Sequence, residues 1–268
     1  MAGFALNSGL EGQTALVTGA SGGIGQAIAR ALAAEGVAVA LHAHRNLSKA
    51  RTLADELGGE ALPVQADLRS EAETDAMMDA VLGWRPRLDH VIVNAGIWEQ
   101  RDAPLHRMSL DQWRGTLDAD LTSAFLTCRA FLRHLAAQPR EHASLVLVGS
   151  TAALFGEARH ADYSAAKAGM VYGLTRSLKN EIVHLAPRGR VNCVCPGWTR
   201  TPMTEAPMQE PGAVEHVTST MSLKKVATPE DVAAAAVFLS SERLAGHLTG
   251  TIVPVAGGME GRRLESPA

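Results

Sequence analysis

The feature that most constrains the fold of this chain is an alternation between two kinds of segment. Short apolar runs rich in β-branched residues are separated by longer Ala/Leu-rich stretches with helical periodicity. Such runs are typical of strands that helices cover on both faces, and their alternation with helices is typical of βαβ units. The sequence therefore predicts an α/β fold, in which a parallel sheet of about seven strands is flanked by helices.

The expected elements follow this alternation along the chain. We expect strands at residues Thr14–Thr18, Val37–His42, Ala61–Gln65, His90–Val93, Ser144–Val148, Arg190–Val194 and Thr251–Val255. We expect helices at residues Gly23–Glu35, Leu47–Leu57, Glu71–Leu82, Ser109–Ala136, Asp162–Leu185 and Pro229–Ser240. No internal repeat or low-complexity linker interrupts the series, so residues 1–268 are predicted to form one domain.

Composition narrows the function classes. The 268 residues are 46% hydrophobic and 20% charged with a net charge of -3, so the chain has no positive field to attract nucleic acid. No stretch approaches the roughly 18 apolar residues of a membrane-spanning helix, and the N-terminus lacks a signal-peptide pattern. We expect a cytoplasmic protein without membrane or nucleic-acid partners. Cys193 and Cys195 lack C-x-x-C spacing and are expected to be buried, reduced thiols.

A glycine-rich turn from Thr18 to Gly25 follows the first expected strand and opens the first expected helix. Glycines there let the backbone approach a pyrophosphate, whose charge meets the free N–H groups and the positive dipole end of the helix. A plain strand-to-helix connection would occupy the same place. The βαβ context favours the nucleotide-binding interpretation.

A second group combines Tyr163, Lys167 and Ser150. Tyr163 and Lys167 are spaced i, i+4, so their side chains can face one cleft from one helix. A tyrosine has an ordinary pKa of about 10, and a neighbouring cation favours the phenolate, so we expect Lys167 to lower the pKa of Tyr163. A lone Tyr-x-x-x-Lys is more often a surface pair, but its agreement with Ser150 and the glycine turn favours an acid–base site.

These motifs together resemble the short-chain dehydrogenase/reductase family over about residues 11–259. The family implies a Rossmann-type, doubly wound sheet and hydride transfer between a nicotinamide and a carbonyl or secondary alcohol carbon. It implies that Tyr163 is the general acid/base, that Ser150 steadies the substrate oxygen and that Lys167 holds the nicotinamide ribose. The cofactor-binding residues that it implies are Gly19, Ser21, Gly23, Ile24, Gly25, Asp67, Leu68, Asn94, Ala95, Gly96, Tyr163, Lys167, Pro196, Gly197, Thr199 and Thr201.

Two positions depart from the family pattern. Where many members have an asparagine that fixes a water in a proton relay, this chain has Asp120. Asp120 can accept a hydrogen bond from such a water but cannot donate one, and an ionised carboxylate competes for the charge of Lys167. We expect Asp120 to keep the acceptor role as a fourth catalytic residue. Ala256 stands where relatives often have an aspartate, and the sequence assigns no consequence to that change.

Cofactor choice is predicted from the end of the second expected strand. An acidic residue there would bond the ribose 2′-hydroxyl, whereas a basic residue accommodates a 2′-phosphate. Residues 41–46 carry no carboxylate and one guanidinium, so NADP(H) is predicted with Arg45 as its phosphate partner. NAD(H) is the alternative if Arg45 is only a solvated surface charge. His42 and His44 form a His-x-His pair, but metal sites need about three or four ligands and no third is apparent, so no metal is predicted.

The substrate side is predicted from residues that follow the motifs. Trp98, Leu154, Phe155, Trp198 and Met203 are expected to wall an apolar pocket, although each could equally belong to the core. Residues 198–226 break the alternation and are expected to form an irregular substrate lid, the alternative being a solvated surface excursion.

The sequence thus predicts an NADP(H)-dependent carbonyl reductase or alcohol dehydrogenase. Within the family it is most similar to 3-oxoacyl-[acyl-carrier-protein] reductase-like members, partly through residues 221–231. The alternatives are an NAD-dependent secondary alcohol or sugar dehydrogenase and a catalytically weak NADP-binding sensor or scaffold. The resemblance also implies a homo-oligomer, a tetramer or a dimer, built through the two long helices and the last strand.

Overall fold

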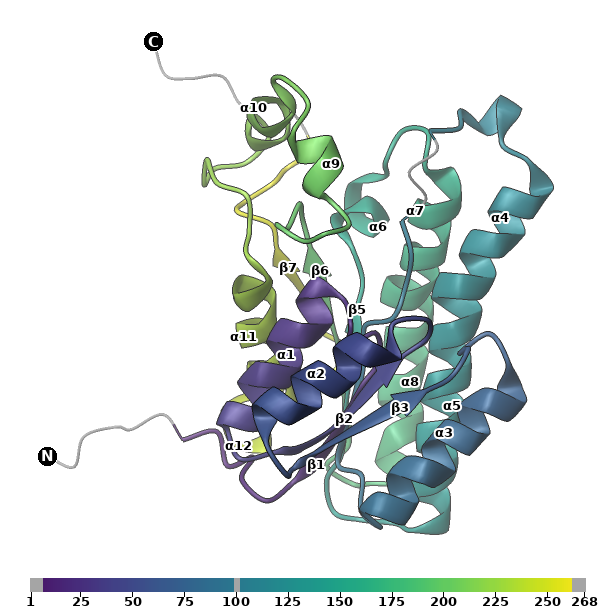
Figure 1. Ribbon diagram of the computed structural model, residues 1–268, viewed down its shortest axis with the longest axis vertical. Coiled ribbons are helices and arrows are strands. Elements are labelled where there is room, and N and C mark those ends of the chain that lie inside the picture. The colour runs from purple at the N-terminus through teal and green to yellow at the C-terminus, as the bar shows by residue number, and fades with distance from the viewer. Residues whose placement is uncertain (1–6, 99–101, 262–268) are drawn as a thin grey trace, which may run out of the picture.

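Seven parallel strands form a single sheet in the computed structural model, which describes residues 7–98 and 102–261 (Figure 1). The order is β3-β2-β1-β4-β5-β6-β7, so the direction of winding reverses between β1 and β4 and leaves a crevice at their carboxyl ends. The strands are β1 (Thr14–Val17), β2 (Ala38–Ala43), β3 (Ala61–Gln65), β4 (His90–Val93), β5 (Ser144–Val148), β6 (Arg190–Pro196) and β7 (Ile252–Val255). The predicted doubly wound α/β fold is confirmed.

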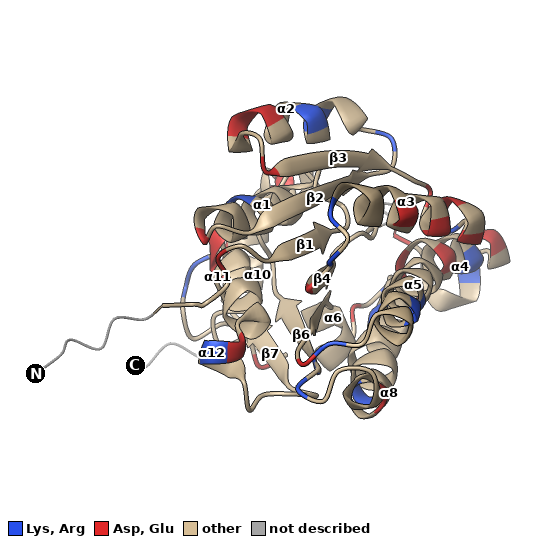
Figure 2. Cartoon of the chain, turned by 90° about the horizontal axis from the view of Figure 1, so that it is seen from below, with Lys and Arg blue, Asp and Glu red and all other residues tan. Residues whose placement is uncertain are grey.

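Helices cover both faces of this sheet, as Figure 2 shows. The helices α1 (Gly23–Ala34), α2 (Leu47–Leu57) and α11 (Pro229–Ser240) pack on one face. The helices α3 (Glu71–Trp84), α5 (Ser123–Ala137) and α8 (Thr175–Glu181) pack on the other.

Strand residues alternate between these two layers. Leu16 enters the core beneath α3, α5 and α8, whereas the next residue, Val17, enters the core beneath α1, α2 and α11. All residues of β1, β2, β4, β5 and β6 are buried. Each fully buried aliphatic side chain stabilises the fold by about 1.5–3 kcal/mol, so the strand ends that carry the site are firmly held.

The two long helices differ from the prediction because each contains a π-helical turn. The expected helix at 109–136 divides into α4 (Leu110–Leu117), the π turn η2 (Asp118–Thr122) and α5. The expected helix at 162–185 divides into α7 (Ala161–Ala168), the π turn η3 (Gly169–Leu174), α8 and the 3₁₀ turn η4 (Ile182–His184). A Cβ on Gly169 would lie 2.9 Å from a methyl carbon of Leu121, so the two π turns pack against each other. Such turns are frequent at functional sites.

Short helices were not predicted because too few residues carry their periodicity. They are η1 (Leu105–Arg107), α6 (Thr151–Phe155), α9 (Glu205–Met208), α10 (Ala213–Thr218) and α12 (Glu242–Ala245). The segment 198–226 is therefore not irregular throughout. Its helices α9 and α10 lie at the same end of the molecule as α6, and a parallel bridge between Thr199 and Ala227 joins its ends (Figure 1).

The described part of the chain contains no helix that is both long and apolar enough to cross a bilayer. Cys128, Cys193 and Cys195 are free and buried, as expected for Cys193 and Cys195.

Candidate active site

A cavity of about 320 Å³ opens at the carboxyl ends of the central strands. A second cavity, of about 560 Å³, shares Gly19, Ser21 and Ala95 with it and extends along the end of β2. Cavities of about 300–1,000 Å³ are typical of small-molecule sites. The predicted residues that line the first cavity are Gly19, Ser21, Gly23, Ile24, Gly25, Asn94, Ala95, Gly96, Ser150, Tyr163, Lys167, Pro196, Gly197, Thr199, Thr201 and Met203.

The glycine turn forms a cradle that side chains would fill. Gly19 has a φ of +66°, and a Cβ there would lie 2.9 Å from the Cα of Ala95. A Cβ on Gly25 would lie 2.2 Å from the carbonyl oxygen of Gly19. The N-cap residue of α1, Gly22, offers no side-chain hydrogen bond to the first turn, which leaves helix N–H groups for an anion. These residues fit a dinucleotide that lies with its phosphates on the turn.

His42 supports this cradle, a role that the sequence did not suggest. Its Nδ1 accepts a hydrogen bond from the N–H of Gly19 at 3.1 Å, and its Nε2 bonds the carbonyl oxygen of Ala66 at 3.0 Å. The ring is therefore a neutral Nε2–H tautomer that ties the glycine turn to the residue before Asp67. Burial lowers the pKa of His42, which keeps it neutral. Both ring nitrogens are occupied, and no metal-ligand cluster occurs among the described residues.

Asn94 acts on the same turn through the backbone. Its Nδ2 donates to the carbonyl oxygens of Thr18 and Gly19 at 2.9 and 3.3 Å. The Thr18 hydroxyl in turn accepts the N–H groups of Asn94 and Ala95. Asn94 thus fixes the cradle and also lines the first cavity, where the resemblance predicts a cofactor contact for it.

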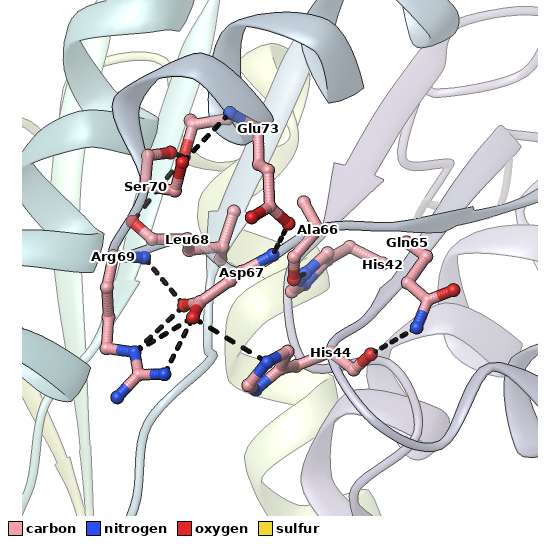
Figure 3. A network of polar contacts seen from close by, with 10 residues as sticks. His42, His44, Gln65, Ala66, Asp67, Leu68, Arg69, Ser70 and Glu73 are labelled. Carbon is pink, nitrogen blue, oxygen red and sulfur yellow. Dashed lines mark hydrogen bonds and ion pairs between the residues drawn. The ribbon is translucent and has the colours of Figure 1, made fainter.

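The wider cavity holds the residues predicted for the adenosine side (Figure 3). Asp67 is held by Arg69, whose guanidinium approaches one carboxylate oxygen at 2.6 Å, and His44 lies 3.7 Å from the same oxygen. Hydrogen bonds from Arg69 hold the pKa of Asp67 well below its ordinary value. Leu68 and Arg45 also line this cavity. Arg45 is exposed, and the described residues give it no ion-pair partner.

Ser150, Tyr163 and Lys167 meet in the first cavity. Ser150 follows β5 and is the N-cap of α6, and Tyr163 and Lys167 lie one turn apart on α7. The Lys167 ammonium is buried, donates to the carbonyl oxygen of Val148 at 3.3 Å and lies 5.6 Å from the centre of the Tyr163 ring. Asp162 anchors this helix by accepting hydrogen bonds from Thr116 and Gln112 of α4.

Asp120 lies behind Lys167 within the π turn. Its Oδ2 is 3.5 Å from the Lys167 Nζ, and its Oδ1 accepts the N–H of Ile97 at 2.7 Å. A Cβ on Gly96 would lie 3.1 Å from both Oδ1 of Asp120 and Nζ of Lys167, so a larger residue at this position would crowd the pair. Asp120 itself does not line either cavity.

Burial dominates the acid–base behaviour of this group. It raises the pKa of Tyr163, against the lowering effects of Lys167 and of a hydrogen bond with Ser150. The expected effect of Lys167 is present but smaller than the effect of burial. Burial also raises the pKa of Asp120, with Lys167 opposing it. Burial disfavours the charge of Lys167, but the Asp120 and Tyr163 charges outweigh it and raise the pKa of the ammonium.

A third cavity, of about 260 Å³, adjoins Ser150 and Tyr163. Four of the predicted wall residues line it, namely Trp98, Phe155, Trp198 and Met203. Leu154 does not, because it packs against the core beneath α3, α5 and α8. The cavity also contains Glu157, which the sequence analysis missed because it lies in a short loop without a motif. Burial raises the pKa of Glu157, against the effects of His160 and of a hydrogen bond from Trp98.

Known proteins are similar to this chain over most of its length. A family model described as enoyl-(acyl carrier protein) reductase matches residues 19–260. The 3-oxoacyl-[acyl-carrier-protein] reductase of Synechocystis sp. (strain ATCC 27184 / PCC 6803 / Kazusa) is 37% identical over 254 residues, which are 93% of this chain and 98% of the relative. The cis-4-hydroxycyclohexanecarboxylate dehydrogenase of Sinomonas cyclohexanicum is 38% identical over 252 residues, which are 92% of this chain and 96% of the relative.

A solved structure agrees. A crystal structure assigned to the short-chain alcohol dehydrogenases, from Sinorhizobium meliloti 1021, superposes with a TM-score of 0.85 at 30% identity and covers 94% of this chain and 98% of that chain. The sheet order, the glycine cradle and these matches lead to one conclusion: the chain belongs to the short-chain dehydrogenase/reductase family of oxidoreductases.

Proposed function

We propose that this protein is an NADP(H)-dependent reductase of ketones or 3-oxoacyl compounds, with Tyr163 as its general acid. The observation that carries the proposal is that two cavities meet at the same two residues. The first cavity, lined by the glycine turn, and the third cavity, here called the apolar cavity, share Ser150 and Tyr163. A carbonyl carbon bound there lies between the two. Relatives named for a 3-oxoacyl-[acyl-carrier-protein] and for a hydroxycyclohexanecarboxylate support this range of carbon skeletons.

The side chains suit proton transfer in the reductive direction. Because burial raises the pKa of Tyr163, its hydroxyl is protonated at neutral pH and can donate to a carbonyl oxygen. The Lys167 ammonium lies beside the ring and stabilises the phenolate that remains. Ser150 donates a second hydrogen bond to the same oxygen. The nicotinamide, when bound, supplies the hydride.

A panel of ketones and 3-oxoacyl thioesters, tested with NADPH and NADH, tests the proposed chemistry. We expect Tyr163→Phe to lower kcat/KM by about 10²–10⁴-fold, the usual range for a general acid. Tyr172→Phe is the matched control because Tyr172, the other tyrosine of the chain, is exposed and lies on η3 outside the cavities. Tight NADPH binding without turnover on any substrate would favour the sensor interpretation instead.

The nucleotide preference rests on Arg45. Arg45 lines the wider cavity, at the end of β2, whereas Arg69, which lines the same cavity, is already held by Asp67. We expect Arg45→Ala to lower kcat/KM for NADPH by about tenfold or more and to leave NADH nearly unaffected, as loss of a phosphate contact would do. Arg51→Ala, on the exposed side of α2, is the control. A wild-type preference for NADH would overturn this assignment.

The oligomeric state of the protein also stays a prediction. A homo-oligomer built through the two long helices agrees with two exposed apolar side chains there, Phe125 on α5 and Tyr172 on η3.

A further inference from the structure

The apolar cavity has an electrostatic character that the proposed function does not explain. Of the described residues that line it, Glu157 is the one carboxyl group, and none is a lysine or an arginine. His216 lines it from α10 and is exposed. The remaining lining is mostly apolar or aromatic. A substrate in this cavity therefore meets a carboxyl group without a fixed cation beside it.

Glu157 is held in place at the wall of the cavity. Its backbone N–H donates to the Ser164 hydroxyl at 3.0 Å, and its Oε1 accepts the indole N–H of Trp98 at 3.2 Å. The Trp98 ring packs on His160, with 4.8 Å between ring centres, and His160 is bonded to Asp102. One oxygen of Glu157 is thus used by the protein, and the described contacts give Oε2 no donor.

A segment that lines this cavity has an excess of acidic over basic residues. Between Thr201 and Met221 the chain carries Glu205, Glu210 and Glu215 and no lysine or arginine, although Lys224 donates to the carbonyl oxygen of Thr218 at the end of α10. Pro207, Val217 and Thr220 of this segment line the cavity, so these carboxylates lie on elements that form part of its wall. These glutamates are exposed, so they oppose an anionic substrate only through a field that salt screens, whereas Glu157 acts at the wall of the cavity itself.

From these observations we infer that Glu157 selects the substrate: it accepts a hydrogen bond from a hydroxyl group of a neutral alicyclic or aliphatic ketone, at a position away from the reacting carbonyl. Together with the glutamates of the segment that lines the cavity, it disfavours substrates that carry a carboxylate or a phosphate, including acyl thioesters on a phosphopantetheine arm. This inference rests on the proposed function. Of the two substrate classes proposed there, ketones and 3-oxoacyl compounds, it favours neutral ketones that carry no acyl-carrier arm.

A matched series of ketones tests the inference with NADPH as reductant. The series comprises 4-hydroxycyclohexanone, 4-methoxycyclohexanone, 4-oxocyclohexanecarboxylate and its methyl ester, with an N-acetylcysteamine thioester and a pantetheine 4′-phosphate thioester of one 3-oxoacyl group. We expect kcat/KM to be about tenfold or more higher for the hydroxy than for the methoxy compound, because a hydrogen bond to a charged acceptor is a strong one. We expect a similar preference for the ester over the carboxylate and for the neutral over the phosphorylated thioester.

Two variants separate the hydrogen bond from the charge. Glu157→Leu removes both, so the hydroxy/methoxy ratio of kcat/KM should fall to about one and the ester/carboxylate ratio should also fall. Glu157→Gln keeps an acceptor oxygen without the charge, so it should lower the ester/carboxylate ratio and retain part of the hydroxyl preference. Glu210→Gln, an exposed glutamate that lines no described cavity, is the control for the hydroxyl ratio.

The outcomes distinguish this inference from the proposed function. If the wild-type enzyme reduces ketones but shows no preference for the hydroxy compound, or if Glu157→Leu leaves both ratios unchanged, the inference is wrong and the proposed function stands. A phosphorylated thioester that exceeds every neutral ketone overturns the inference in the same way. If no carbonyl compound of the wider panel is reduced with either nucleotide, the proposed function fails and the inference fails with it.

Discussion

Two carboxyl groups flank the candidate active site, and the protein treats them differently. Asp120 is completely buried, lies 3.5 Å from the Lys167 ammonium and accepts a backbone N–H. Glu157 is partly buried at a cavity wall and receives one side-chain hydrogen bond, from Trp98. Burial raises the pKa of both. Asp120 has a buried cation of the protein beside it, whereas no lysine or arginine of the described residues lines the cavity that Glu157 faces.

This difference follows from where each residue lies. Asp120 lies in a π turn packed against the helix that carries Lys167, so its neighbours are fixed by the fold. Glu157 lies in the loop between α6 and α7, after Gly156, whose φ is +76°. A charge inside a packed core needs a partner, while a charge at a cavity wall can be satisfied by a ligand. The contrast predicts opposite effects on stability when each carboxyl group is removed.

Removal of the Asp120 carboxylate should have the largest effect. Asp120→Ala leaves the buried Lys167 ammonium without a carboxylate, and breaking a buried pair in this way destabilises a protein by about 3–5 kcal/mol. We expect the free energy of unfolding, measured by chemical denaturation, to fall by this amount. We also expect kcat/KM to fall by about 10²-fold, because the Asp120 charge keeps Lys167 protonated and the Lys167 ammonium favours the Tyr163 phenolate.

Asp120→Asn is the matched variant for that experiment. It keeps an oxygen for the Ile97 N–H, and asparagine is the residue that many family members have at this position. Its kcat/KM should stay within about tenfold of the wild type. An unchanged kcat/KM in Asp120→Ala would remove Asp120 from the mechanism.

The sequence predicted the parts of the molecule that depend on local spacing. The strands, the glycine turn and the i, i+4 pair of Tyr163 and Lys167 are each encoded within a few neighbouring residues. His42 was missed because its two partners, Gly19 and Ala66, are 23 and 24 residues away in the chain. The pKa of Tyr163 was misjudged because spacing reveals the cation but not the burial around it.

Other features have no local signature at all. A π turn needs one extra residue within a helical pattern, so the periodicity of the two long stretches gave no reason to divide them. Leu154 and Phe155 are adjacent large apolar residues, yet Leu154 packs against the core and Phe155 lines the third cavity. The two side chains point in different directions because both residues lie on the five-residue helix α6, which the sequence did not predict.

His42 extends the comparison to the nucleotide half of the molecule, because it is a buried titratable side chain with both polar atoms satisfied. His42→Leu leaves the Gly19 N–H and the Ala66 carbonyl without their partner, at a cost of about 1–3 kcal/mol for each unsatisfied group. We expect the KM for the nucleotide to rise by about tenfold, with a smaller change in kcat, because the cradle loosens while Tyr163 is untouched.

The rescue variant for this test is His42→Gln, whose amide can accept from one backbone group and donate to the other. Its nucleotide KM should lie between those of the wild type and of His42→Leu. Because burial lowers the pKa of His42, its contribution to stability is present above its ordinary pKa of 6.5 and is lost as the pH falls through the lower folded pKa. Equal nucleotide KM values for all three proteins would show that the bridge does not support the cradle.

Removal of the Glu157 charge should have the smallest effect and the opposite sign. Because its pKa is raised above the ordinary 4.5, Glu157 contributes stability below that pH and loses it as the pH rises through the folded pKa. Glu157→Gln removes this loss, so the variant should be more stable than the wild type by about 1 kcal/mol at about pH 8, with the gain vanishing near about pH 4. Unfolding measured across this range, with Glu210→Gln as the control, checks the sign.

A Glu157→Gln variant that is less stable than the wild type at alkaline pH would mean that Trp98 and His160 already stabilise the carboxylate. A gain in stability combined with a loss of hydroxyl preference would show that the wild-type protein gives up stability at this wall for the sake of its substrate.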